Sequence, residues 1–453
     1  MAFRGRLTID QLGRAVEAAE VDTVIVGFCD MQGRLMGKRV HGPAFLDGIA
    51  QNGAEGCNYL LAVDVDMNTI EGYAHASWER GYGDFVLRPD LATLRVIPWL
   101  EGTALCLCDL EWHDRSPVVP SPRQILKAQL ARVAERGWRA MVGSELEFLL
   151  FDESYEQARA LGYRGLTGAN AYNVDYSILG STYVEPVLRA IRLGMAGAGM
   201  PVEDSKGECN FGQHEVNFRY ADALSMADDH TIYRNGAKEI AHQHGRALTF
   251  MPKFDEREGN SCHIHISLWD DERSLFPDAS GHGRSELFSS FIAGIIAHLR
   301  ELTYFLAPNV NSYKRFQRGS FAPTALVWAE DNRTCALRVV GHGNGMRVEV
   351  RVAGGDANPY LAFSALIAAG LAGIDDGLEL EPAWEGSGYD AYDRPHVPTT
   401  LREATALLEG SEVARRALGD EVVEHYLHAA HVEQQQFDQA ITDWELRRSF
   451  ERL

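Results

Sequence analysis

Residues 141–151, MVGSELEFLLF, decide the fold of this chain, because the stretch is mostly apolar and carries two closely spaced carboxylates. Side chains of a β-strand alternate between its faces, so Glu145 and Glu147 share one face while Leu146 and Phe148 take the other. Two like charges at that spacing repel each other unless a cation or bound protons intervene. The stretch predicts a strand with an acidic functional face; two solvated glutamates on a surface strand are the alternative.

Three further stretches repeat this pattern of charged residues in strand-like sequence. In GECNFGQHEVNFRY (207–220), Glu208 and Glu215 lie on either side of Gly212, which predicts two strand arms joined by a turn. In SCHIHISLW (261–269), alternation puts His263 and His265 on one strand face. RVEVRV (347–352) does the same for three charged residues, Arg347, Glu349 and Arg351.

Together these stretches offer a ligand set that is dominated by oxygen, which suits Mg²⁺ or Mn²⁺ better than zinc or copper. Two such ions beside a group of arginines are what phosphoryl transfer requires. The sequence has no Walker A motif and no GxGxxG after a strand, so a nucleotide must bind on another scaffold. Histidines that only make hydrogen bonds remain the alternative for the third stretch.

Composition sets the broad class of the protein. A formal charge of −21 over 453 residues argues against a nucleic-acid partner. The seven cysteines are odd in number and scattered, which predicts no disulfide framework and favours a cytoplasmic protein. The most apolar long run, residues 360–374, is too short to span a bilayer, so we expect no membrane association.

The chain is long enough for two domains. The segment HDRSPVVPSPR (113–123) holds three prolines and no periodicity, which predicts a linker between an N-terminal domain, 1–112, and a larger domain, 113–453. The first contains a helix over 7–20 and strands over 22–30, 31–40, 91–100 and 103–112. The second is expected to be α+β, with a loop-like region over 152–180, strands over 141–151, 214–220 and 262–269, and helices over 122–136, 184–199, 285–306, 357–375 and beyond 400.

Six motifs in this order and spacing resemble the glutamine synthetases: GSELEF (143–148), GECNFGQHEV (207–216), NSCHIHISL (260–268), NSYKRF (311–316), DNRTCALRV (331–339) and RVEVR (347–351). The resemblance runs from about residue 20 to the C-terminus. It implies an α+β fold, with an N-terminal β-grasp domain followed by a glutamine-synthetase-type catalytic domain of curved antiparallel sheet and helices. It also implies a homo-oligomer of hexameric rings, stacked as a dodecamer, with the C-terminal DWELRRSFERL available to dock on another subunit.

The resemblance also implies roles for individual residues. One Mg²⁺ or Mn²⁺ ion, beside glutamate, would be held by Glu147, Glu208 and Glu215, and a second, at the phosphates of the co-substrate ATP, by Glu145, His263 and Glu349. The implied substrate-binding residues are Gly259, His263, Arg315 and Phe321. The implied nucleotide-binding residues are His265, Ser267, Arg338 and Arg347. The residues that this resemblance makes catalytic are Arg333, Arg351, Glu147 and Glu215.

Two features depart from the ammonia-using members of that family. Phe321 stands where those enzymes place a flap glutamate, and EGCNYLLAVDVDMN (55–68) lacks their FDGSS-like segment. A phenyl ring can neither accept a proton nor balance an ammonium charge. The sequence therefore resembles the γ-glutamylpolyamine and γ-glutamylethanolamide synthetases. We expect an ATP-dependent ligase that joins the γ-carboxylate of glutamate to a primary amine through γ-glutamyl phosphate.

Several alternatives stay open at this point. A true glutamine synthetase that uses ammonia is one, and a non-catalytic sensor or structural assembly is another. The amine itself is either a polyamine or a small monoamine such as ethanolamine. A polyamine would favour an entrance lined by carboxylates, for which Asp64, Asp66 and Asp84 are the candidates.

Overall fold

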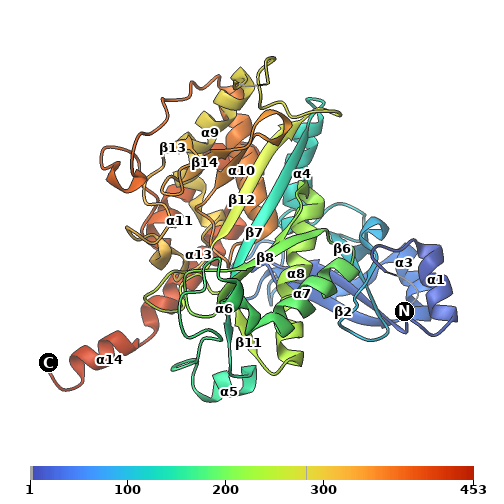
Figure 1. Cartoon of the computed structure of the whole chain (residues 1–453). Helices are drawn as coiled ribbons and strands as arrows, with labels where there is room; N and C mark the ends of the chain where they lie inside the picture. Colours follow the sequence, from blue (N-terminus) through green and yellow to red (C-terminus); the bar gives the residue numbers. More distant parts are fainter. Residues whose placement is uncertain (1–3, 282) are drawn as a thin grey trace.

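The computed structural model describes residues 4–281 and 283–453, which form two β-sheets with helices packed around them (Figure 1). A six-stranded sheet lies within the first 111 residues, and a nine-stranded sheet lies between residues 139 and 350. This confirms the predicted α+β class. The boundary at residue 112 stays a prediction, because buried side chains of both parts join one continuous core.

The N-terminal sheet follows the prediction only in part. Helix α1 (Ile9–Glu17) precedes the hairpin of β1 (Thr23–Cys29) and β2 (Leu35–His41), and β1 pairs in parallel with β6 (Thr103–Glu111). The strand expected over 91–100 is wrong. Asp90 caps a 3₁₀ turn and Pro98 offers no N–H, so the segment pairs over Arg95–Val96 (β5) alone. The prediction also missed β3 (Ala54–Cys57) and β4 (Asp84–Pro89).

The larger sheet is built around its longest strand, β7 (Arg139–Phe151), which contains the stretch quoted first. Its strand order is β13 (Trp328–Glu330), β14 (Leu337–Val340), β15 (Arg347–Val350), β12 (Cys262–Trp269), β7, β9 (Gln213–Phe218) and β8 (Val202–Gly207). Two short strands, β10 (Ala221–Asp222) and β11 (Ala247–Thr249), also pair with β7. Every pairing in this sheet is antiparallel except that of β13 with β14, which is parallel.

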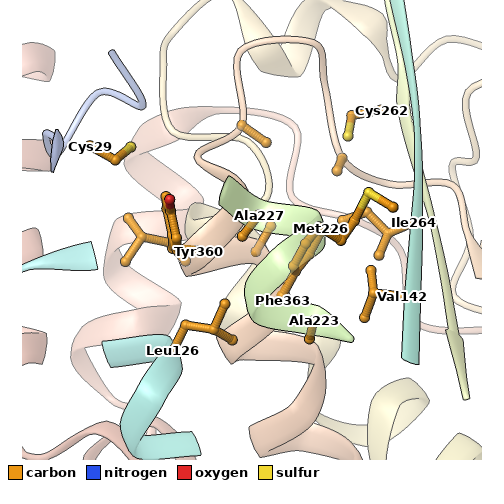
Figure 2. Close-up of a cluster of buried hydrophobic side chains, with 14 of the residues drawn as sticks. Cys29, Leu126, Val142, Ala223, Met226, Ala227, Cys262, Ile264, Tyr360 and Phe363 are labelled. Carbon is orange, nitrogen blue, oxygen red and sulfur yellow. The ribbon is translucent and has the colours of Figure 1, made fainter. Parts of the chain in front are cut away.

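Helices cover one face of this sheet and leave the other to the acidic side chains. Figure 2 shows Val142 and Ile264 of the sheet packed towards Met226 of α8 (Ala223–Gln243) and Phe363 of α10 (Pro359–Asp375). Leu126 of α4 (Pro122–Ala134) extends the same buried layer. Further helices of the larger part of the chain are α7 (Glu185–Gly197), α9 (Glu286–Leu302), α11 (Leu401–Glu409), α12 (Glu412–Leu418) and α13 (Asp420–Gln439).

Two regions complete the fold. The predicted loop over 152–180 contains two short helices, α5 (Tyr155–Ala160) and α6 (Ile178–Thr182), whose starts are capped by Ser154 and Ser177. At the C-terminus, α14 (Asp443–Ser449) projects away from the body of the molecule (Figure 1). Within residues 4–281 and 283–453, no helix combines the length and apolar character that a membrane crossing needs.

Candidate active site

Strand register brings the predicted site residues onto one face of the larger sheet. Glu147 of β7 lies opposite Glu215 of β9, and Glu145 of β7 lies opposite His263 of β12. On the other flank, His265 pairs with Glu349, which in turn pairs with Arg338. Directly opposed residues of neighbouring strands point to the same side, so one face of the sheet collects the charged side chains.

The first group consists of Glu147, Glu208 and Glu215, whose nearest oxygens all lie within 4.8 Å of one another. Glu147 accepts a hydrogen bond from the backbone N–H of Ser261 at 2.6 Å. Burial raises the pKa of Glu147, and the nearby charge of Glu208 raises it further. Burial together with Glu208 and Glu147 raises the pKa of Glu215 well above its usual value. A divalent cation would relieve this repulsion, so the donor set fits the metal that the sequence predicts.

The second group consists of Glu145, His263 and Glu349, which also place ligand atoms within 4.8 Å of one another. His263 Nδ1 lies 3.4 Å from Glu145 Oε2 and 3.6 Å from Glu349 Oε1, a spacing at which three ligands can share an ion. Burial would raise the pKa of Glu145, but hydrogen bonds from His263 and His265 lower it. Both groups therefore match the predicted ligand sets in geometry, while their role as metal ligands stays a prediction.

Two arginines form ion pairs with Glu349 of the second group. Arg338 Nη1 lies 2.7 Å from Glu349 Oε2, and Arg351 makes a close ion pair with the other oxygen of Glu349. Against the effect of burial, His263 and Arg351 lower the pKa of Glu349 to about 2. Arg333 is exposed and lies at the wall of the same cavity. Glu349 thus stays charged over the whole physiological range.

The sheet face opens into two adjoining cavities. The larger, about 470 Å³, is lined by both acidic groups and by Gly259, Phe321, Arg333, Arg338 and Arg351. The second, about 330 Å³, shares Glu145 with the first and is lined by His265, Ser267 and Arg347. His265 Nε2 bonds Glu145 at 2.8 Å, while Arg347 Nε donates to its Nδ1 at 3.1 Å. The residues predicted to bind nucleotide therefore divide between these two cavities.

Arg315 is the predicted residue that the structure does not bring to a cavity wall. It is 2% exposed, and its Nη1 donates to the carbonyl of Val352 at 3.0 Å. Gly259 separates it from the larger cavity, since a Cβ at position 259 would lie 2.7 Å from Arg315 Cγ and 2.1 Å from the carbonyl oxygen of Pro252. A contact of Arg315 with a substrate carboxylate requires movement of this wall, and it stays a prediction.

The mouth of the larger cavity carries two exposed aromatic residues in the left-handed backbone region. Phe321 has φ 58° and is 52% exposed, and Tyr176 has φ 55° and is 70% exposed. Both conformations are uncommon for residues with a side chain, and such residues often mark functional segments. The structure therefore places Phe321 in the wall where the sequence predicts contact with the amine. None of Asp64, Asp66 and Asp84 lines this cavity in the described chain.

Sequence reasoning missed Lys206 and Asp175, which both lie in this wall. Lys206 Nζ lies 2.5 Å from Glu208 Oε1 and 3.1 Å from Asp175 Oδ1. Burial would lower the pKa of Lys206, but the charge of Glu208 raises it. Lys206 and Glu208 are two residues apart, a spacing that places strand side chains on the same face and could have indicated that Lys206 belongs to the site. Asp175 lies in a loop, where the sequence pattern gives no such indication.

Comparison with known proteins agrees with this geometry. Residues 120–449 match the family described as glutamine synthetase, catalytic domain. The chain belongs to the glutamine synthetase family. It is 58% identical to a gamma-glutamylethanolamide synthetase of Streptomyces coelicolor, over 99% of this chain and 96% of that protein. It is 35% identical to a glutamate–isopropylamine ligase of a Pseudomonas species, over 96% of each chain.

Solved structures share the fold of this chain. A solved structure described as a GmaS/ADP complex superposes with a TM-score of 0.84 at 27% identity, covering 97% of this chain and 99% of that one. A glutamine synthetase of Mycobacterium tuberculosis is 33% identical, over 96% of this chain and 97% of that protein. This glutamine synthetase family member is an ATP-dependent carbon–nitrogen ligase, and enzymes of its family use divalent metal ions.

Proposed function

We propose that this chain joins the γ-carboxylate of L-glutamate to a small primary amine through γ-glutamyl phosphate, with ATP as the phosphoryl donor. The observation that carries the proposal is a pair of intact acidic groups and their arginines facing a cavity whose mouth presents Phe321. The resemblance to ammonia-using members of the family implies a glutamate at that position. Ethanolamine is the first candidate amine, because the relative at 58% identity carries that activity in its name.

The residues of the chain divide this reaction between them. Bound in the two acidic groups, Mg²⁺ or Mn²⁺ would act as Lewis acid for the phosphoryl transfer. The larger cavity holds Glu147, Glu208 and Glu215 near Gly259, where we place glutamate. Arg333 and Arg351 line the same cavity, and their charge opposes the negative charge that develops on the transferred phosphoryl group. His265, Ser267 and Arg347 line the second cavity, where we place the nucleotide together with Arg338.

The second step needs an amine nitrogen that attacks the acyl phosphate and expels phosphate. Phe321 offers apolar surface to the carbon chain of an organic amine, which ammonia lacks. Burial of one or two methylene groups against such a wall contributes roughly 1 kcal/mol each. This preference separates the proposed ligase from a true glutamine synthetase, which is the alternative.

We further propose that the chain works as a homo-oligomer of stacked hexameric rings. Supporting this, α14 and the residues after it expose large apolar side chains, among them Trp444 (62%), Leu446 (50%) and Phe450 (90%). Such side chains on a projecting helix are typical of a segment that packs on another subunit.

Phosphate release from purified protein tests the proposed activity. The assay contains ATP, Mg²⁺ and glutamate, with ethanolamine, isopropylamine, putrescine, spermidine or ammonium as the acceptor. Faster turnover with an organic amine than with ammonium supports the proposal. Ammonium as the best acceptor would make the chain a glutamine synthetase, and absence of ATP turnover with every acceptor would leave a sensor or structural role.

A further inference from the structure

Lys206 places an ammonium group inside the larger cavity. It lies in β8 directly opposite Glu215 of β9, so the register turns its side chain to the same face as the acidic groups. Its Nζ lies between Glu208 Oε1, at 2.5 Å, and Asp175 Oδ1, at 3.1 Å. The ring of Tyr176 closes a third side, with its centroid 4.4 Å from Nζ.

These three neighbours form a cage for a small cation, which we call the Lys206 cage and define as Asp175, Tyr176 and Glu208. Carboxylates supply charge-assisted hydrogen bonds, and an aromatic face attracts a cation through its quadrupole. A free ammonium ion would be recognised by the same two interactions. In this chain that place is taken by a group that the protein carries itself.

We propose that Lys206 is a specificity-determining residue, because its ammonium group fills this cage and so denies it to free ammonium. The inference rests on the proposed ligase function. Because the lysine is covalently part of β8, the effective concentration of its ammonium group in the cage is high. A free ammonium ion would have to compete with that concentration. The acceptor amine is then selected by its carbon chain, against surfaces such as Phe321, rather than by capture of a small cation.

The contacts of Lys206 also make a soft metal ion a poorer ligand for this site than the lysine ammonium group. Asp175, Glu208 and Cys209 bring ligand atoms within 4.8 Å of one another, which is a geometry that could hold an ion. Lys206 already forms ion pairs with both carboxylates there, and its single positive charge offsets one of their two negative charges. A soft metal held by Asp175, Glu208 and Cys209 would therefore have to break both of these ion pairs before it could bind.

Lys206 also affects which size of acceptor the cavity admits. A polyamine that enters with its leading nitrogen at the reaction centre carries further ammonium groups. Lys206 opposes those charges from the wall of the same cavity. A small monoamine avoids this repulsion, so the lysine favours ethanolamine and isopropylamine over putrescine and spermidine.

Two substitutions at Lys206 test the idea. Lys206→Met keeps the length of the side chain and empties the cage of charge, while Lys206→Arg keeps a cation in it. Lys127→Met is the matched control, because Lys127 also pairs with a carboxylate, Asp109 at 2.5 Å, but lies outside the cavity. For each protein, kcat and KM are measured for ammonium and for ethanolamine at saturating ATP, glutamate and Mg²⁺.

We expect Lys206→Met to raise the ratio of kcat/KM for ammonium over ethanolamine at least about tenfold, mainly through KM for ammonium, as one charge-assisted hydrogen bond predicts. Lys206→Arg and Lys127→Met should keep the wild-type ratio. An unchanged ratio in Lys206→Met, or the same gain in Lys206→Arg, would overturn the inference. A wild-type enzyme that already prefers ammonium would instead overturn the proposed function, so the two failures are distinguishable.

Thermal melting gives a readout that does not depend on turnover. Ammonium chloride should raise the melting temperature of Lys206→Met above the value in sodium chloride at equal ionic strength, because the emptied cage binds the ion. The wild-type protein should melt at the same temperature in both salts. If Lys206→Met is inactive and also shows no ammonium-specific rise, the cage does not bind ammonium and the inference is wrong.

Discussion

Replacing Glu349 by glutamine probes the most strongly held charge of the site. Glu349 is 1% exposed, and its two oxygens pair with Arg338 and Arg351. Its pKa of about 2, in place of 4.5, corresponds to about 3 kcal/mol in favour of the charged form. Glutamine has nearly the shape of the glutamate side chain but lacks its negative charge, so metal-free Glu349→Gln should lose roughly that much unfolding free energy.

Urea unfolding at pH 7.5 in EDTA measures this loss, and titration with Mn²⁺ followed by electron paramagnetic resonance measures metal binding. We expect two Mn²⁺ sites in the wild-type protein and a weakening of one by more than about tenfold in the variant, as befits the loss of a charged ligand. Glu330→Gln is the control, because Glu330 pairs with Arg284 while 68% of its side chain remains exposed. That change should cost less than about 1 kcal/mol.

Either of two results would refute this reasoning. If Glu349→Gln in EDTA had the same free energy of unfolding as the wild-type protein, the ion pairs of Glu349 with Arg338 and Arg351 would contribute nothing to stability. Two unaltered Mn²⁺ sites would mean that the group of Glu145, His263 and Glu349 does not bind metal.

Three further predictions address the amine wall, a buried histidine and the assembly. Phe321→Glu should increase kcat/KM for ammonium relative to ethanolamine, because a carboxylate can balance the charge and accept the proton; an unchanged ratio in steady-state assays would speak against that role for the wall. Burial lowers the pKa of His230 from 6.5 to about 3, so its neutral form adds stability that is complete above pH 6.5 and is lost as the pH falls below it. Between pH 7.5 and 5.5 the wild-type protein should therefore lose about 1.4 kcal/mol more than His230→Asn in urea unfolding, and parallel curves would contradict this. Deleting residues 441–453, which include Trp444, should reduce the particle mass measured by light scattering to that of a single ring, and an unchanged mass would exclude the C-terminal segment from the assembly.

Sequence alone could predict the charged face of the larger sheet, because strand alternation depends only on neighbouring residues. In β7, alternation fixes that Glu145 and Glu147 point to one side, and a buried apolar face fixes the register that places them opposite His263 and Glu215. The motif order then supplies the family, which the comparisons confirm. The resemblance to that family, together with strand alternation, predicts the members of both acidic groups.

What escaped prediction depends on contacts between distant segments. The strand expected over 91–100 failed because a capped turn and a proline overrode its apolar pattern. Asp175 and Tyr176 reach the cavity from a loop, where no periodicity reports the direction of a side chain. The motif NSYKRF predicts a role for Arg315, but the burial of Arg315 behind Gly259 depends on packing that the motif does not encode.

Direct competition between an organic amine and ammonium measures the proposed amine selectivity of this ligase. The enzyme receives ATP, Mg²⁺ and glutamate with equal concentrations of ethanolamine and ammonium, and mass spectrometry follows the ratio of the two amide products at early times. That ratio equals the ratio of the two kcat/KM values. We expect γ-glutamylethanolamide as the main product, with one ADP formed for each amide. Glutamine as the main product would contradict it.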